Sequence, residues 1–128
     1  MIAGTLIDIA GGQKPIEQIL DGEMIRTRGG YFPALFCEPS REAEDVWTLT
    51  VTSGVTLTAP PDTDVFIKIK KFTPLRMLQR YEMCGAGISS PHVQSVQAAG
   101  RQVVYRLAVQ HAEFAECFAN GIIVKAMG

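Results

Sequence analysis

Residues 118–124 read FANGIIV, and this stretch predicts a tight β-hairpin near the end of the chain. Both central residues of a type I′ turn need a positive φ, which Asn and Gly adopt most readily, so Asn120-Gly121 is the expected turn. The apolar residues on either side are typical of strands. The sequence therefore closes with two antiparallel strands joined by two residues.

A second hairpin is predicted in the middle of the chain, where residues 46–58 read VWTLTVTSGVTLT. Its first strand alternates in polarity, so Trp47, Leu49 and Val51 fall on one face and the intervening threonines on the other. Residues 52–54 supply the turn. This pattern is typical of an antiparallel pair with one buried face.

Short strands and turns account for most of the remaining chain. Strands are expected over 5–9, 24–28, 65–70, 93–96 and 102–109, whereas 31–37 can be strand or loop and 38–45 is a polar loop. Segments 15–23 and 74–82 each begin with a Pro that suits the first helical position. Many short strands punctuated by Gly and Pro predict a mostly-β fold with one or two short helices. No internal repeat or linker is evident, so residues 1–128 are expected to form a single domain.

Composition excludes several classes of protein. Of 128 residues, 47% are hydrophobic and 20% charged, which is typical of a globular domain rather than a disordered one. Lys plus Arg is 12 and Asp plus Glu is 13, without the positive excess of a strongly basic nucleic-acid binder. No apolar run approaches the roughly 20 residues that cross a bilayer, and the first residues lack the basic region of a signal peptide. Three cysteines without CxxC spacing argue against a disulfide framework and favour a reducing compartment.

Three segments, taken in order, resemble the sequence blocks of the Hint family, the hedgehog and intein domains that cleave or splice themselves. Residues 3–23, AGTLIDIAGGQKPIEQILDGE, are similar to the first block, and residues 49–62, LTVTSGVTLTAPPD, to the second. Residues 104–109, VYRLAV, and residues 118–124, FANGIIV, resemble the last two blocks. The resemblance implies a pseudo-twofold, horseshoe-like fold of short antiparallel strands. It also implies that residues 1–4 and 122–126 lie side by side at its centre.

The resemblance further implies a chemistry and the positions that would perform it. In the family, a Cys or Ser at the first position attacks the preceding carbonyl, and a His in the second block protonates the departing amide nitrogen. In inteins a closing His-Asn pair follows, and the Asn side chain cyclises to cut the second junction. The matching positions here are Met1, Thr63, Lys125 and Ala126.

None of these four side chains suits its role. The thioether of Met1 has no thiolate form, and Thr63 has no group that titrates near neutral pH. The amine of Lys125, with an ordinary pKa of about 10.4, is a poor proton shuttle, and Ala126 cannot cyclise. We therefore expect a degenerate Hint domain with no catalytic residue, cofactor or metal. Whether Met1 and Ala126 are native or engineered stays open.

Other reactive side chains are expected to have structural roles. Cys84 or Cys117 could be a displaced nucleophile, but core packing is favoured because free thiols behave as small apolar groups. His92 and His111 could form a general base or a metal site, but neither falls on a family position, and no second ligand has metal spacing.

Two charged groups complete the candidates. Asp62 and Asp64 could bind calcium, but the EF-hand ligand series is absent and a turn is favoured. Lys68, Lys70 and Lys71 form the chain's basic cluster, which could meet phosphate or nucleic acid. A solvated or edge-protecting strand face is the favoured interpretation.

The sequence thus favours a non-catalytic Hint module that serves as a structural or protein-interaction domain. Its partner would be another protein or a second copy in an assembly, with no membrane and no small-molecule substrate. The candidate contact patch is apolar, with core burial as the open alternative: Tyr31, Phe32, Leu35 and Phe36. The alternatives are an autoprocessing Hint domain with substituted residues and a small β-barrel that binds nucleic acid. Because genes of this family travel in phages, the expected location is the cytoplasm or a phage particle, by analogy alone.

Overall fold

The protein is built from short β-strands joined by tight turns and two single turns of 3₁₀ helix. The computed structural model describes residues 1–111, 113 and 115–127. Its strands are β1 (Leu6–Ile9), β2 (Gly12–Pro15), β3 (Met24–Thr27), β4 (Gly30–Pro39), β5 (Glu44–Val51), β6 (Thr56–Ala59), β7 (Asp64–Ile67), β8 (Lys71–Pro74), β9 (Val93–Gln102), β10 (Tyr105–Val109), β11 (Glu116–Ala119) and β12 (Ile122–Lys125). The 3₁₀ helices are η1 (Ile16–Gln18) and η2 (Leu75–Met77). The mostly-β prediction is confirmed. Within the described ranges, no helix has the length and hydropathy to cross a membrane.

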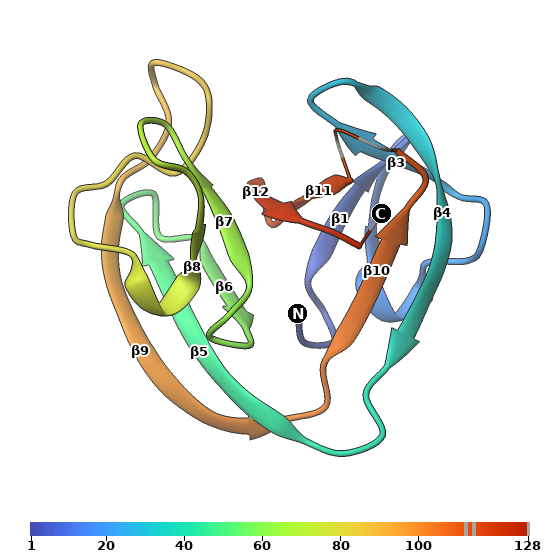
Figure 1. The fold of residues 1–128 in the computed structure, drawn as a ribbon, viewed down its shortest axis with the longest axis horizontal. Helices are drawn as coiled ribbons and strands as arrows, with labels where there is room; N and C mark the ends of the chain where they lie inside the picture. The colour runs from blue at the N-terminus through green and yellow to red at the C-terminus, as the bar shows by residue number, and fades with distance from the viewer. Residues whose placement is uncertain (112, 114, 128) are drawn as a thin grey trace.

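The strands form two antiparallel sheets that bend into a horseshoe (Figure 1). The larger sheet has the order β10-β4-β3-β1-β11-β12-β7-β8, with β2 beside β1, and the smaller has the order β6-β5-β9. In Figure 1, β4 and β10 form one limb, while β5 and β9 curve along the base into the other. Strands β11 and β12 lie between the limbs, close to both chain ends. The horseshoe that the resemblance implied is therefore the observed fold.

The two halves repeat the same backbone hydrogen bonds. In the first half these join Ile16 N to Thr5 O (2.8 Å), Gly22 N to Ala34 O (2.8 Å) and Ala34 N to Glu23 O (2.8 Å); in the second they join Leu75 N to Thr63 O (2.8 Å), Tyr81 N to Val93 O (2.9 Å) and Val93 N to Glu82 O (2.7 Å). Residues 5–34 thus correspond to residues 63–93. The expectation of no internal repeat is wrong: residues 15–24 read PIEQILDGEM, and residues 74–83 read PLRMLQRYEM. The repeat escapes notice because few positions besides Pro, the apolar pair and Glu-Met are shared.

The shared positions explain why each half forms the same turn. Pro15 and Pro74 precede the 3₁₀ helices with φ near −57° and −54°, so the chain enters each turn already bent. The glutamates close the loops, because Glu23 Oε1 accepts a hydrogen bond from the Leu20 N–H at 3.0 Å. Glu82 does the same for Gln79 at 2.6 Å. In each loop, two apolar side chains point into the core: Ile16 and Ile19, and Leu75 and Leu78.

Both predicted hairpins are present. Asn120 and Gly121 have φ of 51° and 80° and join β11 to β12 in the expected register. In the middle hairpin, β5 pairs with β6, and Leu49 and Val51 are fully buried while Thr48 and Thr50 are half-buried. Trp47 is half-buried and packs against the same core. The period-two pattern therefore assigned the buried face of β5 correctly.

Several predicted boundaries are wrong. The helical turn expected over 74–82 ends at Met77, because Leu78 is extended, with φ of −66° and ψ of 136°. Tyr81, with a φ of 74°, turns the chain again further on. The strand expected over 65–70 ends at Ile67, and the next three residues form a hairpin turn before β8. Segment 31–37, left open between strand and loop, lies inside β4, whose N-terminal and C-terminal halves pair with different neighbours.

The strands expected over 93–96 and 102–109 are not separated between residues 96 and 102. Strand β9 continues from Val93 through Gly100, which has a φ of 83°, and ends at Gln102. Its register with β5 shifts between Asp45 and Trp47, opposite this glycine. A β-bulge thus absorbs the positive φ without ending the strand.

Candidate functional site

The two ends of the chain lie along the same edge of β10. The Met1 amine donates to Tyr105 O at 3.3 Å, and Tyr105 N–H donates back to Met1 O at 2.7 Å. Further along the edge, Met127 N–H donates to Leu107 O at 3.0 Å, and Val109 N–H donates to Met127 O at 2.7 Å. Figure 1 shows both ends between the limbs of the horseshoe. The expectation that the two ends meet at the centre is confirmed.

A cavity of about 320 Å³ opens at this meeting point. The turn before β7, the start and middle of β10 and the end of β12 line it together with both chain ends. The lining residues are Met1, Pro60, Asp62, Thr63, Asp64, Val104, Tyr105, Arg106, Leu107, Val124, Lys125, Ala126 and Met127. The cavity therefore gathers all four positions that the resemblance aligns with catalytic groups, although they are up to 125 residues apart in sequence.

Main-chain hydrogen bonds hold the residues of the cavity. Thr63 N–H donates to Pro60 O at 3.0 Å, which fixes the turn that presents Thr63. Ala126 is buried, and its N–H donates to Ala115 O at 2.8 Å. The Lys125 ammonium lies 6.0 Å from the ring centroid of Phe72, so the residue ends β12 beside an aromatic ring.

The Met1 amine is the titratable group most altered by its place at the cavity. Only 7% of Met1 is exposed. Burial lowers the pKa of this amine from 8.0 to about 6, and the nearby Arg106 cation acts in the same direction. In the chain that begins at Met1, the amine is therefore largely neutral at pH 7.

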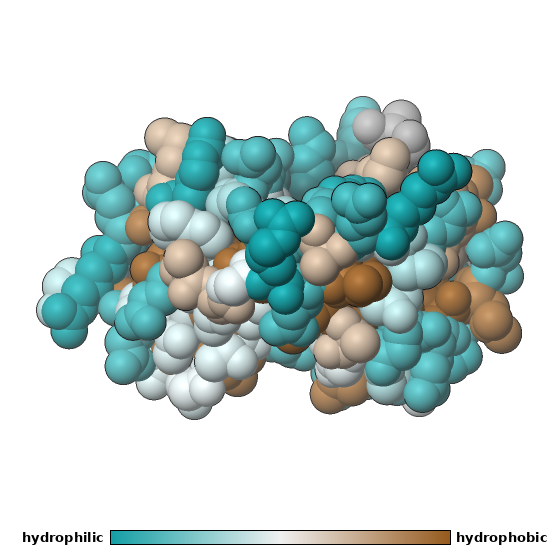
Figure 2. All heavy atoms as spheres, turned by 90° about the horizontal axis from the view of Figure 1, so that it is seen from below, coloured by the Kyte–Doolittle hydropathy of each residue, from teal (hydrophilic) through white to brown (hydrophobic). Residues whose placement is uncertain are grey.

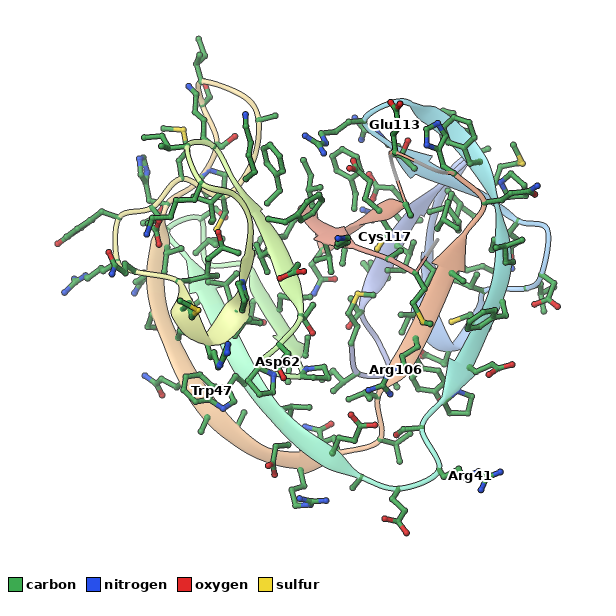
Figure 3. The ribbon with its side chains drawn as sticks, in the orientation of Figure 1. Arg41, Trp47, Asp62, Arg106, Glu113 and Cys117 are labelled. Atoms are coloured by element: carbon green, nitrogen blue, oxygen red, sulfur yellow. The ribbon has the colours of Figure 1, made fainter. Side chains whose placement is uncertain are left out.

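Charged side chains from the two limbs face the mouth of the cavity. Figure 3 shows Asp62 and Arg106 on opposite sides of the gap. Arg106 binds Glu44 with both terminal nitrogens, at 2.7 and 2.9 Å, and these hydrogen bonds hold the pKa of Glu44 below its usual range. Asp62, which is 82% exposed, pairs with Arg76 at 3.3 Å. Asp62 and Arg106 are thus both engaged in ion pairs.

Several solved structures with the same architecture are inteins. The DnaB intein from Synechocystis sp. PCC 6803 has a TM-score of 0.85 and 22% identity, covering 99% of this chain and 98% of that one. The gp41-1 intein has a TM-score of 0.79 and 14% identity, with 94% and 93% covered. The MchDnaB-1 intein has a TM-score of 0.80 and 9% identity, with 94% and 95% covered. The chain has the intein Hint fold. No protein-family model and no curated protein matches the sequence.

Within this Hint fold the three cysteines are poor nucleophiles. Burial raises the pKa of the Cys84 and Cys117 thiols to about 12 and that of Cys37 to about 11. Cys117 is fully buried on β11, between the limbs in Figure 3, and Cys84 is 4% exposed. The Cys37 thiol donates to Ile16 O at 3.3 Å. The prediction that Cys84 and Cys117 pack in the core is confirmed.

Neither histidine of the Hint fold lines the cavity. His92 bridges to Met83, and its N–H donates to Thr52 Oγ1 at 3.0 Å. The His111 ring packs edge-on against Phe32, with ring centroids 4.2 Å apart, and its Nδ1 accepts a hydrogen bond from Glu113 N–H. No group of three metal-binding side chains occurs among the described residues.

The lysine cluster is not one strand face. Lys68 and Lys70 lie in the turn between β7 and β8, and Lys71, with a φ of 64°, opens β8. Lys70 pairs with Glu82 at 3.0 Å, while the Lys71 ammonium lies 5.6 Å from the Phe66 ring centroid. The predicted strand face is wrong because the chain turns at Lys68. A turn places the three ammonium groups in different surroundings.

The candidate contact patch is divided along β4. Tyr31 is 49% exposed and Leu35 45% exposed, whereas Phe32 and Phe36 are half-buried. Phe32 also packs against the hydrophobic core. Two of the four side chains therefore remain available for a partner.

A buried ion pair that sequence reasoning missed lies beside the central strands. Glu116, 1% exposed, accepts hydrogen bonds from the Arg28 guanidinium at 2.8 and 3.0 Å and from the Arg28 backbone N–H at 2.9 Å. The guanidinium also lies 4.0 Å from the ring centroid of Phe66. The two residues are 88 positions apart, and nothing local to either one signals the pairing.

Proposed function

We propose that this chain is a non-catalytic Hint module that acts through association with another protein chain. One observation carries the proposal. The positions that the resemblance aligns with the nucleophile, the block histidine and the closing His-Asn pair meet at one cavity, and they hold Met1, Thr63, Lys125 and Ala126. Since the architecture is retained while each of these groups is replaced, the geometry supports a scaffold role.

The chemistry of each group supports this conclusion. Acyl transfer at the first position needs a nucleophile that can lose a proton, and a thioether has none. Proton donation to the departing nitrogen needs a group that titrates near neutrality, which Thr63 lacks. Cyclisation needs a side-chain amide at position 126, where Ala has only a methyl group. The thiols elsewhere are held as neutral groups by burial.

Autoprocessing is the second candidate function, because both chain ends are held beside one cavity. A residue placed before Met1 would continue along β10 toward Leu107, where Met127 is bound. Both junctions of a processed chain would therefore lie beside the same cavity. This candidate requires a different set of reacting groups from those that the resemblance implies.

A fusion experiment separates the two functions. The chain is placed between two folded reporter domains and incubated at pH 6 to 9, with and without a thiol, and products are followed by mass spectrometry. We expect the fusion to remain whole. The matched control carries Met1→Cys, Thr63→His, Lys125→His and Ala126→Asn, which replaces all four positions with the groups the family uses. Cleavage of the unaltered fusion at either junction would overturn the proposal.

A further inference from the structure

Two surface loops that are related by the internal repeat carry opposite charges at matching positions. We call residues 16–23 the acidic loop and residues 75–82 the basic loop. Their backbones form the same 3₁₀ turn and corresponding hydrogen bonds to Ala34 and Val93. The charges at two matching positions have opposite signs. The matching pairs are Glu17 with Arg76 and Asp21 with Arg80.

Both loops display these charges to solvent next to apolar side chains. The order of buried and exposed residues is identical along the two loops, and all four charged residues are exposed. In the acidic loop, Leu20 is 65% exposed. In the basic loop, Met77 is 57% and Tyr81 69% exposed. Each loop thus combines charge with uncovered apolar area, a combination that is common at protein interfaces.

The contacts that the charged groups make within the chain lie at the surface. Glu17 accepts a hydrogen bond from Gly4 N–H at 2.8 Å, and Arg76 pairs with the exposed Asp62. The Arg80 guanidinium lies 5.1 Å from the ring centroid of Tyr81. Exposed pairs of this kind contribute little to folding, so the charges remain able to meet a partner.

The difference in charge extends beyond the loops. Residues 63–93 contain five Lys or Arg and two Asp or Glu, whereas the corresponding residues 5–34 contain three and four. One half of the repeat is therefore basic and the other slightly acidic. Figure 2, which views the base of the horseshoe, shows apolar residues only in small separate groups among hydrophilic ones. That face offers no single large apolar surface as a competing contact.

We propose that the basic loop of one copy docks on the acidic loop of a second copy of this chain. Arg76 and Arg80 would face Glu17 and Asp21 of the second copy, and Met77 and Tyr81 would pack against its Leu20. The second copy is the fitting partner because the chain itself carries the complementary charges on the same backbone scaffold. This inference rests on the proposed function in that it names the partner for the association role.

The contact joins two different surfaces, so it is heterologous. Each copy keeps one unused loop after the first contact, and association continues to a ring or an open chain. A small contact rich in exposed charges forms weakly and weakens further as salt screens it. Complementary charges also set the orientation of the encounter.

Sedimentation velocity of the full chain tests the proposal across protein concentration at about 20 mM and about 500 mM salt, where screening differs several-fold. At low salt the weight-average mass should rise with concentration from 13.9 kDa toward at least twice that value, and high salt should return it to 13.9 kDa. Two charge-reversed variants should each stay monomeric: Glu17→Arg with Asp21→Arg, and Arg76→Glu with Arg80→Glu. Mixing the two should restore association, as should combining all four changes in one chain.

A matched control for the Arg76→Glu, Arg80→Glu variant carries Arg41→Glu and Arg101→Glu, which lowers the net charge equally but away from both loops. Arg41 lies at the base of the horseshoe (Figure 3). This control should associate like the unaltered chain, and Trp47 fluorescence reports whether each variant is folded.

A chain that is monomeric at low salt, or one whose association survives reversal of either loop, would refute the contact. So would a monomeric chain whose basic loop binds vesicles containing phosphatidylserine. Cleavage in the fusion assay would defeat the proposed function and leave this mass measurement standing, so the two failures are distinguishable.

Discussion

Met1 and Met127 bind the same edge of β10, Met1 in the antiparallel sense and Met127 in the parallel sense. Their hydrogen-bond partners, Tyr105 and Leu107, are only two residues apart. One strand therefore holds both ends of the chain and places them at one cavity. The burial that results at Met1 leads to a dependence of stability on pH.

The chain that begins with a free amine at Met1 should become more stable as the pH rises from about 6 to about 8. Burial lowers the pKa of this amine to about 6 in the folded state from 8.0 in an exposed one. Between these values the unfolded state binds more protons, so the free energy of unfolding increases with pH. The full gain is on the order of 3 kcal/mol, because the two pKa values differ by about two units and one unit corresponds to about 1.4 kcal/mol. Urea unfolding followed by Trp47 fluorescence measures it.

Acetylation of the Met1 amine is the control, because it removes the titrating group and adds few atoms. The acetylated chain should lose most of the slope between pH 6 and pH 8. Equal slopes for the two forms would show that the amine is not the group responsible.

Replacing Glu116 by Gln should destabilise the protein by about 3 kcal/mol, because a buried charge would lose its partner. Arg28 is only partly exposed and would keep its position against Phe66 without a counter-charge. Thermal or urea unfolding measures the loss. Asp45→Asn is the matched control, since Asp45 pairs with Arg101 at the surface, where 71% and 62% of the two side chains are exposed. Its cost should stay below about 0.5 kcal/mol, and similar costs for both variants would contradict a buried pair.

Asn120 should stabilise the protein through its side chain as well as its turn. Its Oδ1 accepts a hydrogen bond from Leu6 N–H at 2.8 Å, and its Nδ2 donates to Thr56 O at 2.8 Å, so it joins β1 to β6 in the other sheet. Asn120→Gly keeps the positive φ and loses only these contacts, which should cost about 2 kcal/mol for two hydrogen bonds. Asn120→Ala also strains the turn and should cost about 1 kcal/mol more. Equal stability of the glycine variant and the unaltered chain would show that the side chain adds nothing.

Local patterns in the sequence predict the turns and buried faces of this fold well. The Asn120-Gly121 hairpin and the buried face of β5 follow from φ preferences and the period of two, which act over a few residues. Long-range pairing is not local, so the Arg28–Glu116 ion pair and the shared edge of β10 could not be predicted from periodicity. The meeting of the two chain ends was predicted from the resemblance to the Hint family and not from local patterns.

The boundaries that prediction missed depend on backbone conformations that composition does not reveal. Tyr81 and Lys71 adopt positive φ, which side chains other than Gly rarely do, and each marks a turn that composition alone does not reveal. Gly100 has the opposite effect, since a bulge carries β9 through a residue that favours a break. The location of the candidate site was predicted from the four positions that the resemblance aligns with catalytic groups of the Hint family. The charges of the two related loops were missed because the repeat itself was not recognised.

The three thiols should differ in reactivity in the folded protein. Cys84 and Cys117 are buried, whereas Cys37 is half-buried, so a small alkylating reagent should label Cys37 first. Its rate should still be far below that of a free thiol, because burial raises the pKa of Cys37 to about 11 and the thiolate is the reacting form. Iodoacetamide labelling at pH 8, with peptide mass mapping, measures each site, and a urea-unfolded sample gives the unprotected rates. Rapid labelling of Cys117 in the folded chain would reveal a reactive thiol beside the cavity and would count against the non-catalytic role.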